Sequence, residues 1–307
     1  MISVNSLSKS FNEVKAVSSL TFDVKQGEIF GIVGPDGAGK STLLRMLSAI
    51  LVPDSGVITM KGDDIFHNTY ATKERIAYMP QRFGLYEDLT VEENIFFFGR
   101  LFGLKMKEIK AKLPVLYKFS SLEPFRERLA GNLSGGMKQK LGLACCLVHN
   151  PEVILLDEPT NGVDPVSRRE FWRILYGLLT DGVTIIISTA YLDEAERCSR
   201  IALMYNGSFI NIGEPKIIKS MVEKPLIEII CGNARKGELI LKKTQQFGSV
   251  SRTGESLKLF VQNKRRDSNL IKKELTVKGI SIKTIREIEP SLEDIFIEVI
   301  TMEKGAA

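Results

Sequence analysis

The sequence feature that most constrains the fold is GPDGAGKS, from Gly34 to Ser41, which fits the pattern G-x-x-x-x-G-K-[ST]. The apolar run EIFGIV precedes it, and the run TLLRML follows it. Glycines here let backbone N–H groups curl around phosphate oxygens, a lysine supplies a cation to the β and γ phosphates, and a hydroxyl suits Mg²⁺. The spacing predicts a strand, a phosphate-binding loop and a helix in that order. The residues expected around the phosphates are Gly34, Asp36, Gly37, Ala38, Gly39, Lys40, Ser41 and Thr42.

A second chemical motif is VILLDE, an apolar run from Val153 that ends in two acids, Asp157 and Glu158. A carboxylate at a strand tip can hold hydrated Mg²⁺, so we expect Asp157 to contribute to a metal site with Ser41. Glu158 is the candidate to accept a proton from an attacking water. The two motifs together predict a nucleotide-hydrolysing site that uses magnesium.

The order of predicted elements indicates an α/β fold followed by a smaller α+β domain. Residues 1–33 read as antiparallel strands, residues 82–132 as an inserted helical subdomain broken at Gly99, Gly103 and Pro114, and residues 136–220 as alternating helices and strands of a parallel sheet. The composition shifts near Met221, so we expect domains at 1–221 and 222–307. The second shows the β-α-β-β-α-β order of ferredoxin-like folds. A last helix should open at Ser291, because Ser291-Leu-Glu-Asp294 has capping-box spacing.

Composition argues against several other classes of protein. The opening MISVNSLSKS is not typical of a secretory signal, and no run reaches the roughly 18 apolar residues of a membrane-spanning helix. The four cysteines show no CxxC spacing, and two histidines are too few for a histidine metal site, so we expect reduced core thiols. The net charge is +5, and the basic clusters 242–243 and 264–266 are short. We therefore expect a solvated surface there and no nucleic-acid partner.

The segment LSGGMKQK, 133–140, joins the first two motifs in a pattern that resembles an ATP-binding cassette (ABC) ATPase over about residues 1–220. The resemblance implies a P-loop NTPase nucleotide-binding domain in which Ser134, Gly135 and Gly136 cap ATP held by another cassette. It implies that Gln81 senses Mg²⁺ and connects to a membrane partner, with Asp164 at the cassette–cassette contact. Phe11 matches the aromatic residue that stacks on adenine, and we favour that role although an aromatic on a strand otherwise usually packs in the core. Met137 and Asp36 replace the family's usual Gln and Asn.

Ala190 stands where the resemblance places a switch histidine, the residue that contacts the γ-phosphate and holds water and Glu158 in line. His67 and His149 belong to other segments, and Thr189 should point elsewhere if the strand alternates. Losing a directed donor from a transition state costs about 3 kcal/mol. The hypothesis is that the chain binds ATP but hydrolyses it poorly at its own site. In the alternative, water or Tyr191 fills the role.

The run MPQRFGLYEDLTVEEN, the Ala190 gap and the ending EPSLEDIFIEVI are more closely similar to drug-exporter-type cassettes serving type-two ABC permeases. The similarity extends to the first cassette of tandem-cassette members. The sequence is then either half of a longer protein or a separate subunit that meets an unlike cassette, and both alternatives stay open. The expected location is cytoplasmic, peripheral on the inner face of the membrane through a multi-span permease. Phe83, Leu85 and Tyr86 are either a groove for a permease helix or packing within the insert.

Three functions are consistent with these motifs to different degrees. The first is a transport motor in which ATP-driven closure of two cassettes powers an exporter. The second is a regulatory module that binds ATP while a partner cassette hydrolyses it. The third, a cassette ATPase of DNA repair or translation, is disfavoured because the insert is short and aromatic and shows no heptad run.

Overall fold

The computed structural model describes residues 1–82, 84–244, 247 and 249–306. It divides into two compact units, Met1–Gly213 and Glu214–Ala307. The predicted boundary at 221/222 lies eight residues later than this division. The difference is helix α8 (Pro215–Ser220), which contacts helix α11 (Leu292–Ala306) of the second unit. A helix that packs on the second unit belongs with it, even though the composition changes only after it.

The first unit is built on a six-stranded sheet with strand order β10-β9-β3-β8-β7-β6. The strands from β9 to β6 pair in parallel, and β10 pairs antiparallel with β9. Every residue of the neighbouring strands β3, β8 and β7 is buried, because helices and a second sheet cover both faces. The strands are β3 (Ile29–Val33), β6 (Ile76–Met79), β7 (Val153–Asp157), β8 (Thr184–Thr189), β9 (Arg200–Tyr205) and β10 (Ser208–Gly213).

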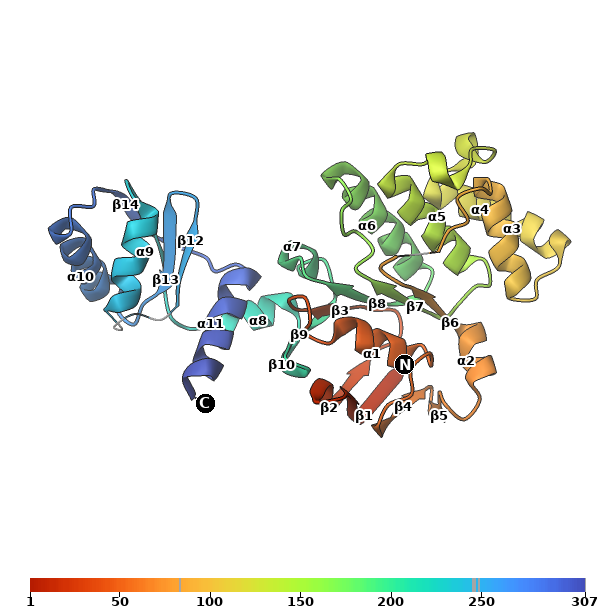
Figure 1. Cartoon of the computed structure of the whole chain (residues 1–307), viewed down its shortest axis with the longest axis horizontal. Coiled ribbons are helices and arrows are strands. Elements are labelled where there is room, and N and C mark those ends of the chain that lie inside the picture. The colour runs from red at the N-terminus through yellow and green to blue at the C-terminus, as the bar shows by residue number, and fades with distance from the viewer. Residues whose placement is uncertain (83, 245–246, 248, 307) are drawn as a thin grey trace. The chain divides into compact units, whose positions relative to one another are not determined.

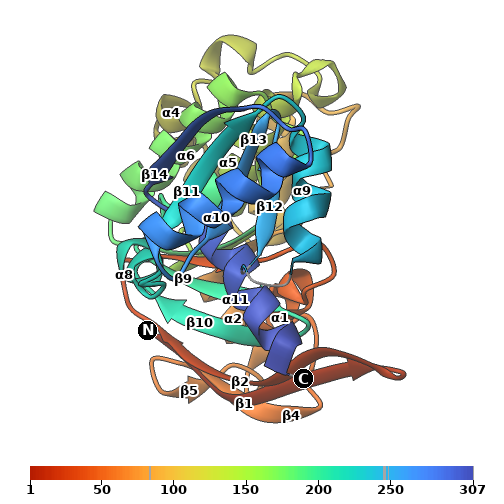
Figure 2. The same ribbon diagram turned by 90° about the vertical axis from the view of Figure 1, so that its left-hand side faces the viewer.

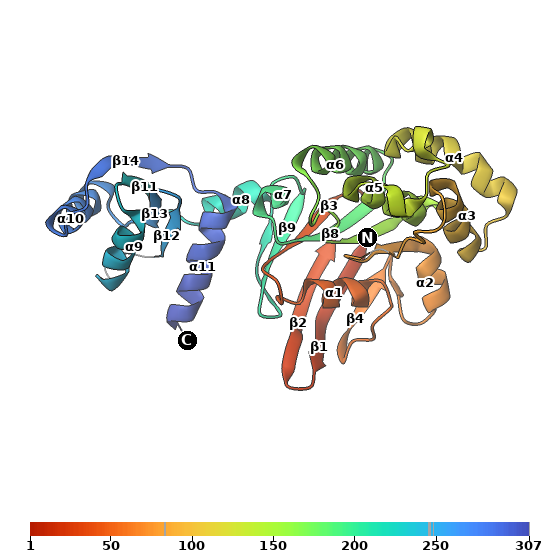
Figure 3. The ribbon, with the colours of Figure 1, turned by 45° about the horizontal axis from the view of Figure 1, so that its top comes forward.

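A four-stranded antiparallel sheet, order β2-β1-β4-β5, forms the other layer. Helix α1 (Lys40–Leu47) lies between the two sheets, and its leucines join a core with residues of both (Figures 1 and 3). The run EIFGIVG was grouped with the antiparallel strands of residues 1–33, but it forms β3 in the parallel sheet. Its uninterrupted apolar character suits a strand buried on both faces rather than one. The antiparallel strands are β1 (Ile2–Phe11), β2 (Val14–Val24), β4 (Ser55–Met60) and β5 (Asp63–Asp64).

The predicted helical insert contains α3 (Val91–Leu101) and α4 (Met106–Ser120), which lie beside α5 (Gly135–Leu147) and α6 (Pro165–Thr180) (Figure 1). Two short 3-10 turns, Glu123–Phe125 and Ala130–Asn132, lead back to α5. Of the three expected breaks, only Gly103 lies between helices. Gly99 lies inside α3, where a Cβ would lie 2.7 Å from Ile109, so the glycine allows close packing on α4 instead of ending the helix. Pro114 lies inside α4. The first unit also contains α2 (Thr69–Arg75) and α7 (Leu192–Ala195).

The second unit has the strand order β12-β13-β11-β14, antiparallel throughout, as expected for a ferredoxin-like fold. Helices α9 and α10 cover one face of this sheet (Figure 2) and share an apolar core with it. The predicted cap of the last helix is present, since the backbone N–H of Asp294 donates to Ser291 Oγ at 3.2 Å. The remaining elements are β11 (Leu226–Cys231), α9 (Ala234–Lys243), β12 (Val250–Thr253), β13 (Ser256–Phe260), α10 (Lys264–Val277) and β14 (Ile282–Ile288).

Two expectations from composition can be compared with the described residues. Cys145, Cys146, Cys198 and Cys231 are free and buried, as predicted for core thiols. Within residues 1–82, 84–244, 247 and 249–306, no helix is both long enough and apolar enough to cross a bilayer.

Candidate nucleotide-binding site

The glycine-rich loop connects the end of β3 to the start of α1 and depends on glycine at two close approaches. Gly39 has φ +107°, and a Cβ there would lie 2.1 Å from the carbonyl oxygen of Ala16. A Cβ on Gly34 would lie 2.1 Å from the carbonyl oxygen of Met204. Any side chain at either position would move the loop off the neighbouring strands. The loop therefore carries no side chain at Gly34, where it leaves β3, or at Gly39, where it joins α1.

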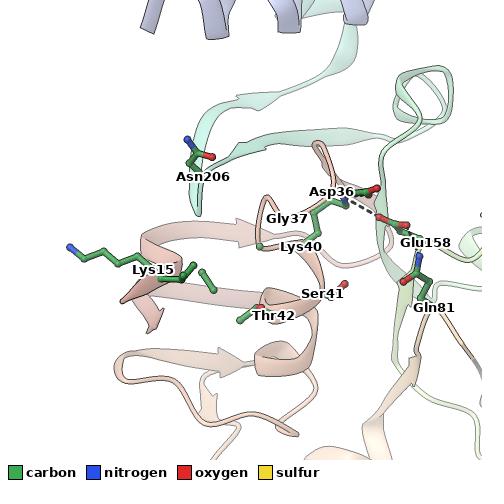
Figure 4. Close-up of a pocket in the computed structure, with 12 residues that line it drawn as sticks. Lys15, Asp36, Gly37, Lys40, Ser41, Thr42, Gln81, Glu158 and Asn206 are labelled. Atoms are coloured by element: carbon green, nitrogen blue, oxygen red, sulfur yellow. Dashed lines mark hydrogen bonds and ion pairs between the residues drawn. The ribbon is translucent and has the colours of Figure 1, made fainter. Parts of the chain in front are cut away.

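Lys40 has its ammonium group folded back into this loop and is 4% exposed. Its Nζ donates to the carbonyl oxygens of Gly34 at 2.8 Å and Pro35 at 3.0 Å, and forms an ion pair with Glu158 Oε1 at 3.0 Å (Figure 4). Asp36, at 4.0 Å from the same Nζ, is 94% exposed and makes a weaker contact. A buried cation is thus held beside the loop by three acceptors.

Asp157, at the end of β7, is buried and has three hydroxyl donors. Ser41 Oγ donates to its Oδ1 at 3.0 Å, Ser188 Oγ to the same oxygen at 2.7 Å, and Tyr78 Oη to its Oδ2 at 3.2 Å. Burial, followed by the charge of Asp157, raises the pKa of Tyr78 to about 12, so this tyrosine stays a donor at neutral pH. The carboxylate is fixed from strands β6 and β8 as well as from α1.

Glu158 follows in the left-handed region, with φ +48°, which is uncommon for a residue other than glycine. Its backbone N–H donates to Ser188 Oγ at 3.0 Å. Its Oε2 accepts from Gln81 Nε2 at 3.0 Å and from Asn161 Nδ2 at 3.3 Å. Strained backbone of this kind is retained where surrounding contacts hold it, and here it aims the carboxylate at Lys40.

Beyond Ser188, the end of β8 lies next to both motifs, but the side chains of Thr189 and Ala190 make no hydrogen bond to them. Val33 of β3 pairs with Thr189, and the N–H of Gly34 donates to the Thr189 carbonyl at 3.2 Å. The hydroxyl of Thr189 donates to Glu194 Oε2 at 2.9 Å, so it points elsewhere, as the sequence predicted. Ala190 follows at an exposed position and presents only a methyl group.

A pocket of about 580 Å³ opens in front of the loop (Figure 4). Of the predicted site residues it brings together Asp36, Gly37, Gly39, Lys40, Ser41, Thr42, Gln81 and Glu158. Gly34, Ala38 and Asp157 are buried and do not line the pocket. The pocket also has lining residues that were not predicted, namely Val14, Lys15, Ala16 and Asn206.

Phe11 and the signature segment lie outside this pocket lining. Phe11 ends β1 and is 47% exposed, so it is not a core residue, with Lys9 Nζ 5.8 Å from its ring centroid. Ser134 caps α5 by accepting from the backbone N–H of Met137 at 3.3 Å. Gly135 is exposed, and a Cβ on Gly136 would lie 2.5 Å from the Cβ of Ser167. Adenine stacking by Phe11 and the capping role of the signature segment stay predictions.

Of the segment proposed to bind a permease helix, Phe83 lies outside the described residues. Tyr86 is 48% exposed, and its ring centroid lies 4.4 Å from that of Phe97 in α3. Its backbone exchanges hydrogen bonds with the buried side chain of Asn94, at 3.0 Å each way. Tyr86 is therefore anchored to the insert while one side of its ring stays exposed.

Two family models match the chain. The ABC transporter model matches residues 17–161, and the model of the C-terminal domain of DrrA1-3-like ATP-binding proteins matches residues 213–300. The first match includes the glycine-rich loop and the two acids at the end of β7, Asp157 and Glu158.

The chain is similar to curated proteins along nearly all of its length. It is 42% identical over 305 residues to the probable multidrug ABC transporter ATP-binding protein YbhF of Escherichia coli (strain K12), covering 98% of this chain and 52% of that protein. The chain thus spans about half the length of that relative. It is 37% identical over 300 residues to the Nod factor export ATP-binding protein I of Rhizobium sp. (strain N33), covering 97% and 96% respectively.

Solved structures show the same architecture. The cbiO1 protein of Clostridium perfringens, part of the ABC transporter complex cbiONQ, superposes with a TM-score of 0.67 at 28% identity over 79% of this chain and 96% of that one. A dimeric bacterial ABC transporter cassette gives 0.64 at 25% identity over 70% and 98%. Together with the near full-length similarity to the rhizobial protein, these matches mean that the chain belongs to the family of ABC transporter ATP-binding proteins, which are ATPases.

Proposed function

We propose that this chain is the ATP-binding cassette subunit, or half, of an exporter, and that its own site hydrolyses ATP slowly because Ala190 replaces a polar residue. The names of the two relatives, multidrug and Nod factor export proteins, support the exporter part. One contrast carries the proposal. The phosphate loop has its lysine, hydroxyl and acids in place, whereas the residue after β8, Ala190, presents only a methyl group.

We expect the loop to bind a triphosphate because it already holds the buried ammonium group of Lys40. Lys40 holds Glu158 at 3.0 Å, and phosphate oxygens carry more negative charge than one carboxylate. An incoming triphosphate would therefore take Lys40 from Glu158, while the bare loop and the start of α1 supply N–H donors. Lys15 and Asn206 would lie along the same pocket.

The donor set fits Mg²⁺. Ser41 Oγ and Asp157 Oδ1 are 3.0 Å apart, and Gln81 lines the same pocket, so the available ligands are oxygen atoms of the kind that Mg²⁺ prefers. These three residues would hold the ion directly or through water. When bound, Mg²⁺ would neutralise developing charge on the phosphates.

Hydrolysis would depend on Glu158 as the general base. Once Lys40 turns to phosphate, Glu158 keeps Gln81 and Asn161 as partners and its carboxylate is free to accept a proton from water. A second polar group from β8 would normally hold that water and the γ-phosphate in line. Ala190 supplies none, so we expect binding without efficient turnover.

Assembly with a second cassette would complete the nucleotide site. Ser134 and Gly135 are exposed at the start of α5, where a hydroxyl and N–H groups can face ATP held by a second cassette. We propose an unlike second cassette, on a continuing chain or a separate one, and a multi-span permease contacted through the exposed side of Tyr86. The complex would place this chain on the cytoplasmic face of the membrane.

A regulatory role is the second candidate. In this role the chain binds ATP without hydrolysing it, and its signature segment contacts the ATP that a partner cassette hydrolyses. Ala190 favours this role, whereas the well-anchored Glu158 favours residual hydrolysis.

A mixing experiment with two copies of this chain tests the composite site. In the double variant Ala190→His/Ser134→Arg, the chain's own hydrolytic site is repaired and its signature segment is disabled. In Lys40→Ala, the chain's own site is disabled and its signature segment is intact. Each variant alone should be nearly inactive, and an equimolar mixture should hydrolyse MgATP well above the sum of the two. A mixture no more active than its components, with MgATP bound to the first variant, would contradict completion in trans.

A further inference from the structure

A hydrogen-bonded chain runs from the residue after Ala190 to the proposed catalytic base. Tyr191 Oη donates to Asn161 Oδ1 at 3.4 Å, and Asn161 Nδ2 donates to Glu158 Oε2 at 3.3 Å. Tyr191 follows β8 and Asn161 follows β7, so the chain bridges the two strand tips. It reaches the carboxylate oxygen that Lys40 does not contact.

The chemistry of an amide gives this chain a direction. An asparagine side chain has one oxygen that accepts and one nitrogen that donates, and rotation by half a turn exchanges them. A hydroxyl that donates to Oδ1 fixes the Asn161 amide with its nitrogen toward Glu158. The carboxylate of Glu158 can only accept and so selects the same orientation, and without the hydroxyl the amide loses its second anchor and can rotate away from Oε2. Tyr191 therefore controls a donor that it does not itself supply.

Independent contacts hold the tyrosine ring in place. The guanidinium of Arg168 lies 4.4 Å from the ring centroid, and its Nε lies 3.4 Å from Glu194 Oε1. Glu194 is fully buried and accepts from Thr160 Oγ1 at 2.6 Å and Thr189 Oγ1 at 2.9 Å. Because Thr160 and Thr189 belong to the two segments that the chain joins, Glu194 fixes their spacing.

We infer that Tyr191 and Asn161 are positioning residues that orient Glu158 for its reaction with water, in partial replacement of the polar residue absent at Ala190. This inference rests on the proposed hydrolytic function. This positioning matters most with nucleotide bound, because Lys40 then leaves Glu158 and only the contacts to Oε2 hold the carboxylate. Neither residue touches phosphate in this account, so both act on rate through Glu158.

The test uses Tyr191→Phe, which keeps the ring over Arg168 and removes only the hydroxyl. Its matched control is Tyr176→Phe in α6, because Tyr176 is 39% exposed against 38% for Tyr191 and its hydroxyl donates to the Arg197 carbonyl instead. Single-turnover hydrolysis of radiolabelled MgATP gives the rate, and equilibrium titration gives the nucleotide affinity. Both substitutions are made in the native chain and in Ala190→His.

Tyr191→Phe should lower the hydrolysis rate of the native chain about fivefold at unchanged MgATP affinity, while Tyr176→Phe changes neither. In the Ala190→His background the same substitution should cost less than about twofold, because the histidine then orients the reacting groups. A folding defect would lower the rate equally in both backgrounds. Equal losses in both, or no loss in the native chain, would overturn the inference.

A second readout does not depend on turnover. The carboxyl carbon resonance of Glu158, assigned by its disappearance in Glu158→Gln, should shift in Tyr191→Phe and stay in place in Tyr176→Phe. An unmoved resonance in Tyr191→Phe would overturn the inference. Failure of the native chain to bind MgATP would instead contradict the proposed function, and the resonance would still decide whether the chain of hydrogen bonds reaches Glu158.

Discussion

Strands β7 and β8 lie side by side in the parallel sheet, with Asp157 paired to Ser188, yet their ends differ in what they contribute. The end of β7 carries two acids, each with several partners. At the end of β8, Ser188 hydrogen-bonds to both acids and Thr189 donates to Glu194. Ala190, which follows, has no polar side-chain atom. One tip carries the proposed chemistry and the other mainly supports it.

We propose that this difference separates binding from catalysis along one edge of a sheet. In the proposed function, contacts to phosphate and to Mg²⁺ would come from the loop after β3 and from β7, and they would act on bound nucleotide as well as on the transition state. A donor at the end of β8 would act chiefly where charge develops during reaction. Under the proposed function, losing that donor should lower turnover and leave affinity in place, as expected of a cassette that works with an unlike partner.

Lys40→Ala should have the largest effect on binding. Removing the buried ammonium group deletes the charged donor to phosphate, and the dissociation constant of MgATP should rise about a hundredfold. Titration with a fluorescent ATP analogue measures it. Lys15→Ala, an exposed lysine that lines the same pocket, is the control and should change affinity far less. Equal losses in the two variants would show that the pocket binds by diffuse charge alone.

Ser188→Ala tests whether β8 supports β7. The buried hydroxyl donates to Asp157 and accepts from the N–H of Glu158, so its loss removes one of the three hydroxyl donors to Asp157 and one of two acceptors of the Glu158 N–H. The free energy of unfolding should fall by about 2 kcal/mol, measured by urea denaturation of the first unit's transition. Thr180→Ala, whose exposed hydroxyl bonds within α6, should cost much less. A stable Ser188→Ala chain would mean that the acids do not depend on β8.

Tyr78→Phe probes the same tip from β6 and should cost about 1 kcal/mol of unfolding free energy at neutral pH. The pKa of Tyr78 is raised to about 12, whereas an unfolded tyrosine has a pKa near its ordinary value of about 10. Between these values the unfolded chain releases a proton that the folded chain keeps, so stability falls as pH rises through this window. Tyr78→Phe should weaken that alkaline loss, measured by denaturation at pH 8 and pH 11.

The exposed Tyr70 provides the reference for this prediction, because it is 74% exposed. Tyr70→Phe should leave the alkaline slope unchanged. An identical slope in the native chain and in Tyr78→Phe would show that folding does not raise the pKa of Tyr78.

The loop and the acids were predictable from sequence because each is a local pattern. The glycines, Lys40 and Ser41 lie within eight consecutive residues, and Asp157 and Glu158 end one apolar run. Their environment was not predictable, because Ser188 and Tyr78 reach Asp157 only through the register of three strands far apart in the chain. Pattern identifies a motif, and strand pairing decides what surrounds it.

Other differences have equally physical causes. The run LDEAE looks like a solvated helix surface, yet Glu194 is fully buried because two threonines and Arg168 satisfy its carboxylate. Lys15 lines the pocket from β2 and Asn206 from the turn between β9 and β10, and no motif marks either position. The ferredoxin-like unit was predictable in order, since each element has its own hydrophobic period, whereas α8 could be assigned to it only from its packing.

Turnover of MgATP by Ala190→His, beside the native chain at equal nucleotide occupancy, tests the central claim most directly. A grafted histidine recovers only part of the roughly 3 kcal/mol that such a donor contributes, so the hydrolysis rate should rise about tenfold with MgATP affinity unchanged. An unchanged rate, or brisk hydrolysis by the native chain alone, would contradict the account, because the tip of β8 would then not limit the reaction.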